Sequence, residues 1–169
     1  MKHLTVRVVL LCLLLTACSP KEQKPTLSYE QRTGLYETAI EAARDQAANQ
    51  AFPLIDDDDD DAVQAAFDLL NLSREDVSAY AISVSLMNVK AYAVAAIYPA
   101  AGKKDTVLES LRRFVSNRQQ SFKEYLADQY EIAVNTRLET LEDGTVLLVM
   151  SDNQDALFDA IRDTVERGK

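Results

Sequence analysis

SAYAISVSLM, the sequence of residues 78–87, alternates between small and bulky side chains. The bulky residues are Tyr80, Ile82, Val84 and Leu86, with alanine or serine between them. A repeat of two residues is typical of a β-strand, because successive side chains of a strand point to opposite faces of a sheet. Residues 89–98, VKAYAVAAIY, continue the pattern after a turn at Met87-Asn88, so the two runs predict a β-hairpin.

A second hairpin is predicted further along the chain. Residues 136–141 and 145–150 are β-rich runs on either side of Glu142-Asp143-Gly144. An Asp-Gly step between two such runs is a strong hairpin signal. The run Val146–Met150 is apolar on both faces, which predicts a central strand.

Helical spacing of apolar residues marks the segments around these hairpins. The first helix follows Ser28, which forms a capping-box pattern with Gln31, and Pro53 ends it. Its polar face carries Glu41 and Arg44. Further helices are predicted at 62–70, at 106–126 with a capping box of Thr106 and Glu109, as one or two turns at 128–134, and from Asp152 or Asn153 to Gly168.

The order of these elements predicts the fold class. Two leading helices are followed by strand, strand, helix and again strand, strand, helix. This order favours an α+β fold with one four-stranded antiparallel sheet, made of two β-hairpins that are each followed by a helix. The helices are expected to pack across one face of the sheet. The order of the strands within the sheet does not follow from the pattern.

The N-terminal segment has the features of a lipoprotein signal. Lys2 and Arg7 precede an apolar run from Val8 to Leu15, and Leu15-Thr16-Ala17-Cys18 matches a lipobox. The sequence therefore predicts a signal peptide at 1–17, a lipidated tether at 18–27 and a single α+β domain at 28–169. Cys18 would carry the lipid, so the membrane is an expected partner and the domain an extracytoplasmic one.

Composition then excludes several kinds of chemistry. The formal net charge of −9 becomes −11 once Lys2 and Arg7 leave with the signal, which disfavours nucleic acid as a partner. His3 and Cys12 would leave as well, and Cys18 would be lipidated. The mature domain is then expected to lack the groups needed for Ser-His-Asp or Cys-His catalysis and for zinc binding. Its four glycines are too scattered for a phosphate loop, and no cofactor is expected.

Six consecutive aspartates, Asp56, Asp57, Asp58, Asp59, Asp60 and Asp61, are a candidate calcium site, because calcium takes several oxygen ligands. A straight run lacks the glycine turn and the closing glutamate of known calcium loops. The favoured alternative is a solvated acidic loop whose last aspartate caps the next helix.

Three further groups of residues are weaker candidates for a site. Arg112, Arg113, Arg118 and Lys123 form a basic face on the long helix that could receive an anion or an acidic partner, although pairing with nearby carboxylates is favoured. Ser83, Ser85, Tyr92 and Tyr98 could line a ligand groove, although close helix packing is the default. Glu131 and Glu139 are the nearest candidates for a catalytic carboxylate pair, and exposure is favoured for both.

Taken together, several features resemble one family. They are the lipobox, the helix that ends in Leu69-Leu70-Asn71-Leu72, the run Glu75-Asp76-Val77-Ser78-Ala79-Tyr80, the second strand, the arginine-containing helix and the late Asp-Gly hairpin. Over about residues 30–165 they are similar to domain-of-unknown-function family 4358, which comprises small lipoproteins found mainly in Gram-positive anaerobes. The chain departs from the family at Asn88-Val89-Lys90, where an acidic residue often begins the second strand. The resemblance implies a lipoprotein and no site residue.

The sequence therefore predicts a non-enzymatic binding or interaction module at the cell envelope, with an envelope protein as a candidate partner. A lipoprotein that binds a small ligand is the first alternative. A hydrolase that acts on the cell wall with carboxylates alone is the second.

Overall fold

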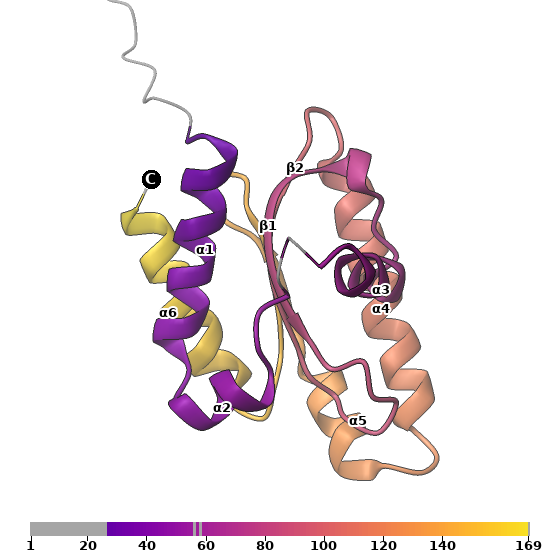
Figure 1. The fold of residues 1–169 in the computed structure, drawn as a ribbon. Helices are drawn as coiled ribbons and strands as arrows, with labels where there is room; N and C mark the ends of the chain where they lie inside the picture. The colour runs from indigo at the N-terminus through magenta and orange to yellow at the C-terminus, as the bar shows by residue number, and fades with distance from the viewer. Residues whose placement is uncertain (1–26, 56, 58, 169) are drawn as a thin grey trace, which may run out of the picture.

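The computed structural model describes residues 27–55, 57 and 59–168. Its centre is one antiparallel sheet of four strands, which confirms the predicted α+β fold (Figure 1). The strands are β1 (Val77–Val84), β2 (Ala93–Pro99), β3 (Arg137–Thr140) and β4 (Val146–Met150). Their spatial order is β1-β2-β4-β3, so the two hairpins join through β2 and β4. Ala95 of β2 lies between Ile82 of β1 and Leu148 of β4.

Helices cover both faces of this sheet, so the expectation of helices on one face is wrong. On one side lie α1 (Tyr29–Ala43), α2 (Gln46–Ala51) and α6 (Gln154–Arg167), and on the other lie α3 (Asp60–Leu70), α4 (Lys104–Phe122) and α5 (Ala127–Val134) (Figure 1). The reason is that β2 and β4 are apolar on both faces. Leu147 and Val149 pack in the core beside α1 and α6, whereas Leu148 and Met150 pack in the core beside α3 and α4.

The first predicted helix is divided into α1 and α2. The capping box of Ser28 and Gln31 is confirmed at the start of α1. The helix stops where Arg44 takes an extended conformation, with φ −107° and ψ 155°. Asp45 then caps α2, because its carboxylate accepts a hydrogen bond of 2.7 Å from the backbone N–H of Ala48. The break reorients Arg44, which the helical pattern placed on the polar face.

One other cap prediction is wrong. The long helix α4 begins at Lys104, so Thr106 lies inside its first turn, and the N-cap residue Lys103 makes no side-chain cap bond. At α6 the predicted residue Asn153 is the N-cap, although its side chain makes no cap bond. Helix α4 ends at Phe122, which leaves Tyr125 outside it with 88% of its surface exposed. The sequence had predicted a helix over 106–126, which includes Tyr125.

A buried ion pair fastens α1 to the turn between β3 and β4. Arg32 Nη1 lies 2.7 Å from Asp143 Oδ2, and both side chains are more than nine-tenths buried. The Arg32 guanidinium also stacks over the Tyr98 ring at 3.7 Å. Next to the pair, the Tyr36 hydroxyl lies 2.6 Å from Thr145 Oγ1, and burial raises the pKa of Tyr36 to about 12. Asp143, predicted as part of a turn, therefore also holds a helix to the sheet.

Within the residues that the structure describes, no helix is both long enough and apolar enough to cross a membrane.

The two-sided core predicts that neighbouring residues of β4 are equally important for stability. Leu147 and Leu148 are both fully buried, and they face opposite layers. We expect Leu147→Ala and Leu148→Ala each to lower the free energy of unfolding by about 2–5 kcal/mol, because each leaves a cavity in its own core. Urea unfolding of both variants tests this. A sheet covered on one face would give one large loss and one close to zero.

Candidate functional site

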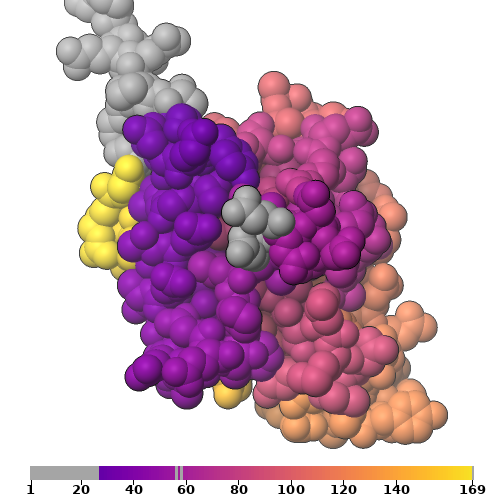
Figure 2. All heavy atoms as spheres, in the orientation of Figure 1, coloured from indigo at the N-terminus to yellow at the C-terminus, as the bar shows by residue number. Residues whose placement is uncertain are grey.

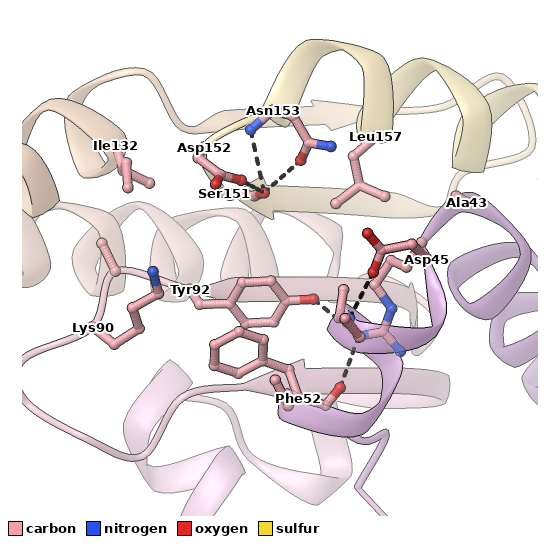
Figure 3. Close-up of a pocket in the computed structure, with 15 residues that line it drawn as sticks. Ala43, Asp45, Phe52, Lys90, Tyr92, Ile132, Ser151, Asp152, Asn153 and Leu157 are labelled. Atoms are coloured by element: carbon pink, nitrogen blue, oxygen red, sulfur yellow. Dashed lines mark hydrogen bonds between the residues drawn. The ribbon is translucent and has the colours of Figure 1, made fainter.

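A cavity of about 810 Å³ lies at the end of the sheet where β1 and β4 finish and β2 begins. Segments from both helical layers reach it (Figure 3). The end of α1, together with α2, forms one wall, Lys90–Tyr92 another and Ser151–Asn153 a third, with Ile132 of α5 and Leu157 of α6 completing it. We call this cavity the Arg44 pocket after the residue that organises it.

The floor of the Arg44 pocket is a stacked aromatic pair. The rings of Phe52 and Tyr92 lie 3.9 Å apart between centroids, with an interplanar angle of 13°. Phe52 follows α2, whereas Tyr92 directly precedes β2, so the stack joins the outer layer to the sheet. Aromatic faces of this kind offer a flat apolar surface to a ligand.

Arg44 fixes this floor through one nitrogen. Its Nη1 donates to the carbonyl oxygen of Phe52 at 2.8 Å, to Ser83 Oγ at 2.9 Å and to the Tyr92 hydroxyl at 2.9 Å. Ser83 Oγ in turn donates to the Phe52 carbonyl at 2.7 Å. Three acceptors share the two hydrogens of Nη1, so rotation of the Arg44, Ser83 or Tyr92 side chain would break a bond to a half-buried charge. The floor is therefore held in one arrangement.

Charged and polar side chains form the rim. Lys90 lies at one end of the pocket and Asp45 at the other, with the Phe52–Tyr92 stack between them (Figure 3). Asp152 lies on the third wall. Ser151 Oγ is 2.7 Å from Asn153 Oδ1 and 3.2 Å from Asp152 Oδ1, which orders the turn that leads into α6. The pocket thus combines an apolar floor with separated charges of both signs.

Only two of the four residues predicted to line a groove, Ser83, Ser85, Tyr92 and Tyr98, come together in the structure. Ser83 and Tyr92 meet at Arg44. Tyr98 lies at the opposite end of β2, under Arg32. The carbonyl of Ser85 accepts from Arg118 on the other side of the sheet. Arg44 was missed because helical periodicity assigned it to solvent. The available signal was Asp45, whose side chain can cap a new helix and so end the previous one.

One of the four residues of the predicted basic face, Arg118, is buried. Arg118 is 6% exposed, and its Nη2 donates to the carbonyl of Ser85 at 3.2 Å. The guanidinium lies near the rings of Phe114 and Phe122, and burial lowers the pKa of Arg118. Arg112, Arg113 and Lys123 are exposed, and Arg113 pairs with Glu109 at 3.1 Å. A role for these three cations in binding an anion or acidic partner stays a prediction.

The aspartate run is only partly described, since Asp56, Asp58 and also the lipidation residue Cys18 lie outside the described residues. Asp59, rather than the last aspartate, caps α3 through the N–H of Ala62 at 3.1 Å. Asp57 accepts a hydrogen bond from the Tyr29 hydroxyl. Among the described residues, no three histidine, cysteine, aspartate or glutamate side chains form a group suited to a metal ion. Calcium binding by the whole run stays a prediction.

The two candidate catalytic carboxylates lie away from the Arg44 pocket. Glu139 is on the edge strand β3 and pairs with Arg137 at 2.7 Å. Glu131 is exposed on α5. Neither lines the pocket, so the structure does not bring this pair together around a substrate cavity.

The role of Arg44 in the pocket can be tested by substitution. We expect Arg44→Met to lower the free energy of unfolding by about 1–3 kcal/mol, because the Tyr92 hydroxyl and the Phe52 carbonyl lose a charged donor. Arg112→Met removes an exposed arginine of α4 and should cost less than about 0.5 kcal/mol. Urea unfolding measures both. Equal values would contradict the organising role of Arg44.

Comparison with known proteins identifies a family. Residues 54–151 match the family described as a domain of unknown function, DUF4358. The chain has no significant match among curated proteins or among solved structures. The matched segment contains all four strands, and with them Lys90, Tyr92 and Ser151 of the pocket, whereas Arg44 and Phe52 precede it. The match covers more than half of the sequence and agrees with the resemblance noted above, so the chain belongs to the DUF4358 family.

Proposed function

We propose that this protein is an extracytoplasmic lipoprotein that binds a small ligand in the Arg44 pocket without chemically transforming it. The observation that carries the proposal is a cavity of about 810 Å³ over an aromatic floor that Arg44 holds in place. Pockets for small molecules commonly have volumes of roughly 300–1,000 Å³ and combine apolar walls with a few polar groups. The Arg44 pocket fits this description.

Preorganisation supports binding. Three hydrogen bonds tie the Phe52–Tyr92 stack to Ser83 and Arg44, and a fourth joins Arg44 to Ser83. A ligand that settles on this floor does not have to order it, so less of the interaction free energy is lost on association. The facing wall is built from Ala43, Ala47, Ala48 and Ala51, whose short side chains leave the cavity open.

The groups that line the pocket are better suited to recognition than to catalysis. Arg44 Nη1 donates to the floor, and Asp45 Oδ1 accepts the backbone N–H of Ala48 that caps α2. The Ser151 hydroxyl is held by the turn before α6. Residues 27–168 contain no histidine or cysteine, the usual general base and the strongest nucleophile among side chains. Hydrogen bonding, stacking and charge pairing are the interactions that this lining offers.

The position of the pocket suits a protein held at its N-terminus. The lipobox precedes α1, and the pocket begins at Ala43, where α1 ends. With 15 residues at about 1.5 Å each, α1 separates its first residue, Tyr29, from the start of the pocket by about 22 Å. The proposed anchor would therefore join the described domain at the end of α1 that is farther from the pocket.

The lipid anchor can be tested separately from the pocket. In bacteria grown with radiolabelled palmitate, we expect the full-length protein to be labelled and to sediment with membranes. Cys18→Ala removes the thiol that receives the lipid and should abolish both. Cys12→Ala is the matched control, because this residue lies in the segment expected to be cleaved. Equal labelling of the Cys18→Ala variant would refute the anchor.

Ligand binding can be tested with a panel of small compounds: neutral sugars, carboxylic acids, amines and short peptides. We expect at least one class to shift the backbone amide signals of Lys90, Ala91 and Asp152 in NMR spectra. Ala47→Trp fills the wall and should weaken that binding at least tenfold. Ala65→Trp places the same ring at an exposed position of α3, on the other side of the sheet, and should leave binding unchanged.

A panel in which no compound shifts these signals would overturn the small-ligand function. The interaction module would then be the better reading, with its surface in the exposed apolar residues Leu86, Met87 and Val89 of the loop between β1 and β2.

A further inference from the structure

We infer that the ligand of the Arg44 pocket is a short peptide with both termini free, bound with its carboxylate at Lys90 and its ammonium group at Asp45. This inference rests on the proposed function, since it names the chemical class of the ligand in that pocket. The observation behind it is that Lys90 and Asp45 lie at opposite ends of the cavity, with the aromatic floor between them (Figure 3).

The charge of the lining selects for a ligand without net charge. The charged residues of the pocket are two cations, Arg44 and Lys90, and two anions, Asp45 and Asp152. A simple anion would be attracted by Lys90 but repelled by the two carboxylates. A simple amine would be attracted by the carboxylates but repelled by the two cations. A neutral sugar would leave the charged groups without matching partners. A zwitterion with separated charges satisfies both ends.

The availability of the rim groups sets the orientation of the peptide. Arg44 holds three oxygen atoms of the floor through Nη1 and its Nε is buried, so Lys90 is the cation better placed to receive a carboxylate. At the other end, Asp45 Oδ1 accepts from the N–H of Ala48 at 2.7 Å. A carboxylate has about four acceptor positions, so the cap leaves capacity for an ammonium group.

The middle of the pocket matches the middle of a peptide. Peptide groups need both donors and acceptors when they leave water. The side-chain amide of Asn153 offers both kinds of group on the wall opposite the aromatic floor, because the Ser151 hydroxyl occupies only one acceptor position of Asn153 Oδ1 (Figure 3). Phe52, Tyr92 and Leu157 can receive apolar side chains. The small alanines of α2 leave room for the chain of the peptide.

The test uses four forms of one peptide with the full-length protein. Trialanine, N-acetyl-trialanine, trialanine amide and the doubly blocked peptide are titrated calorimetrically and by the amide signals of Lys90 and Asp152. We expect trialanine to bind and each single block to weaken it at least tenfold, because each removes one charge pair. The doubly blocked peptide should bind more weakly than either.

Two variants assign the ends. Lys90→Met should weaken the binding of trialanine at least tenfold. In this variant, amidation of the peptide carboxylate should have almost no further effect on binding. Asp45→Asn should also weaken the binding of trialanine at least tenfold, and acetylation of the peptide should then have almost no further effect. Asparagine preserves the cap of α2. Lys104→Met and Asp105→Asn are the matched controls, because both residues are exposed at the start of α4, outside the pocket lining, and these variants should bind like the parent protein.

The outcomes separate the inference from the function on which it rests. Equal binding of free and blocked peptides, or binding of sugars, acids or amines in the pocket without binding of peptides, would overturn the peptide class and leave the small-ligand function standing. If acetylation of the peptide, rather than amidation, no longer changed its affinity for the Lys90→Met variant, the proposed orientation of the peptide would be overturned. If no compound of the panel and no peptide bound in the pocket, the small-ligand function itself would be overturned.

Discussion

The burial of β2 and β4 on both faces is the constraint on which the rest of the structure depends. These central strands carry apolar side chains in both directions, and all five residues of β4 are buried. A sheet of this kind loses stability if either face meets water, so it needs two helical layers. The leading helices α1 and α2, together with the final helix α6, supply one layer, and the helices α3, α4 and α5 supply the other. The first and last parts of the chain therefore have to meet on the same face.

That meeting explains where the polar interactions of the interior are placed. At one end of α1, Arg32 is buried against Asp143 in the turn between β3 and β4. At the other end, Arg44 joins the segment after α1 to β1 and β2. Both arginines hold a helix that is distant in sequence from its strand, and hydrogen bonds to charged groups are directional as well as strong. The space-filling view shows the leading helices, in indigo and purple, lying against the magenta and pink segments (Figure 2).

The pocket is a consequence of the same architecture. Where α1 breaks at Arg44 and Asp45, the short helix α2 turns across the end of the sheet and only alanines face the gap. The lining then comes from segments spread from Ala43 to Leu157, and it joins a rigid aromatic floor to a charged rim. A cavity assembled in this way suits recognition of a small molecule with both polar and apolar parts, which is the basis of the proposed function.

The sequence by itself determined the elements whose signal is local. The alternation of residues 78–84, the Asp143-Gly144 turn and the Ser28–Gln31 capping box each describe neighbours along the chain, and each is confirmed. Residues 85–87, predicted to continue the first strand, lie outside β1. Only the tertiary structure decided the strand order, the second helical layer, the inward turn of Arg118 and the role of Arg44. These depend on contacts between distant segments, such as Arg44 with Tyr92 or Arg118 with Ser85. A helical pattern shows which residues share a face, but the energy of burying that face depends on what the rest of the chain places against it.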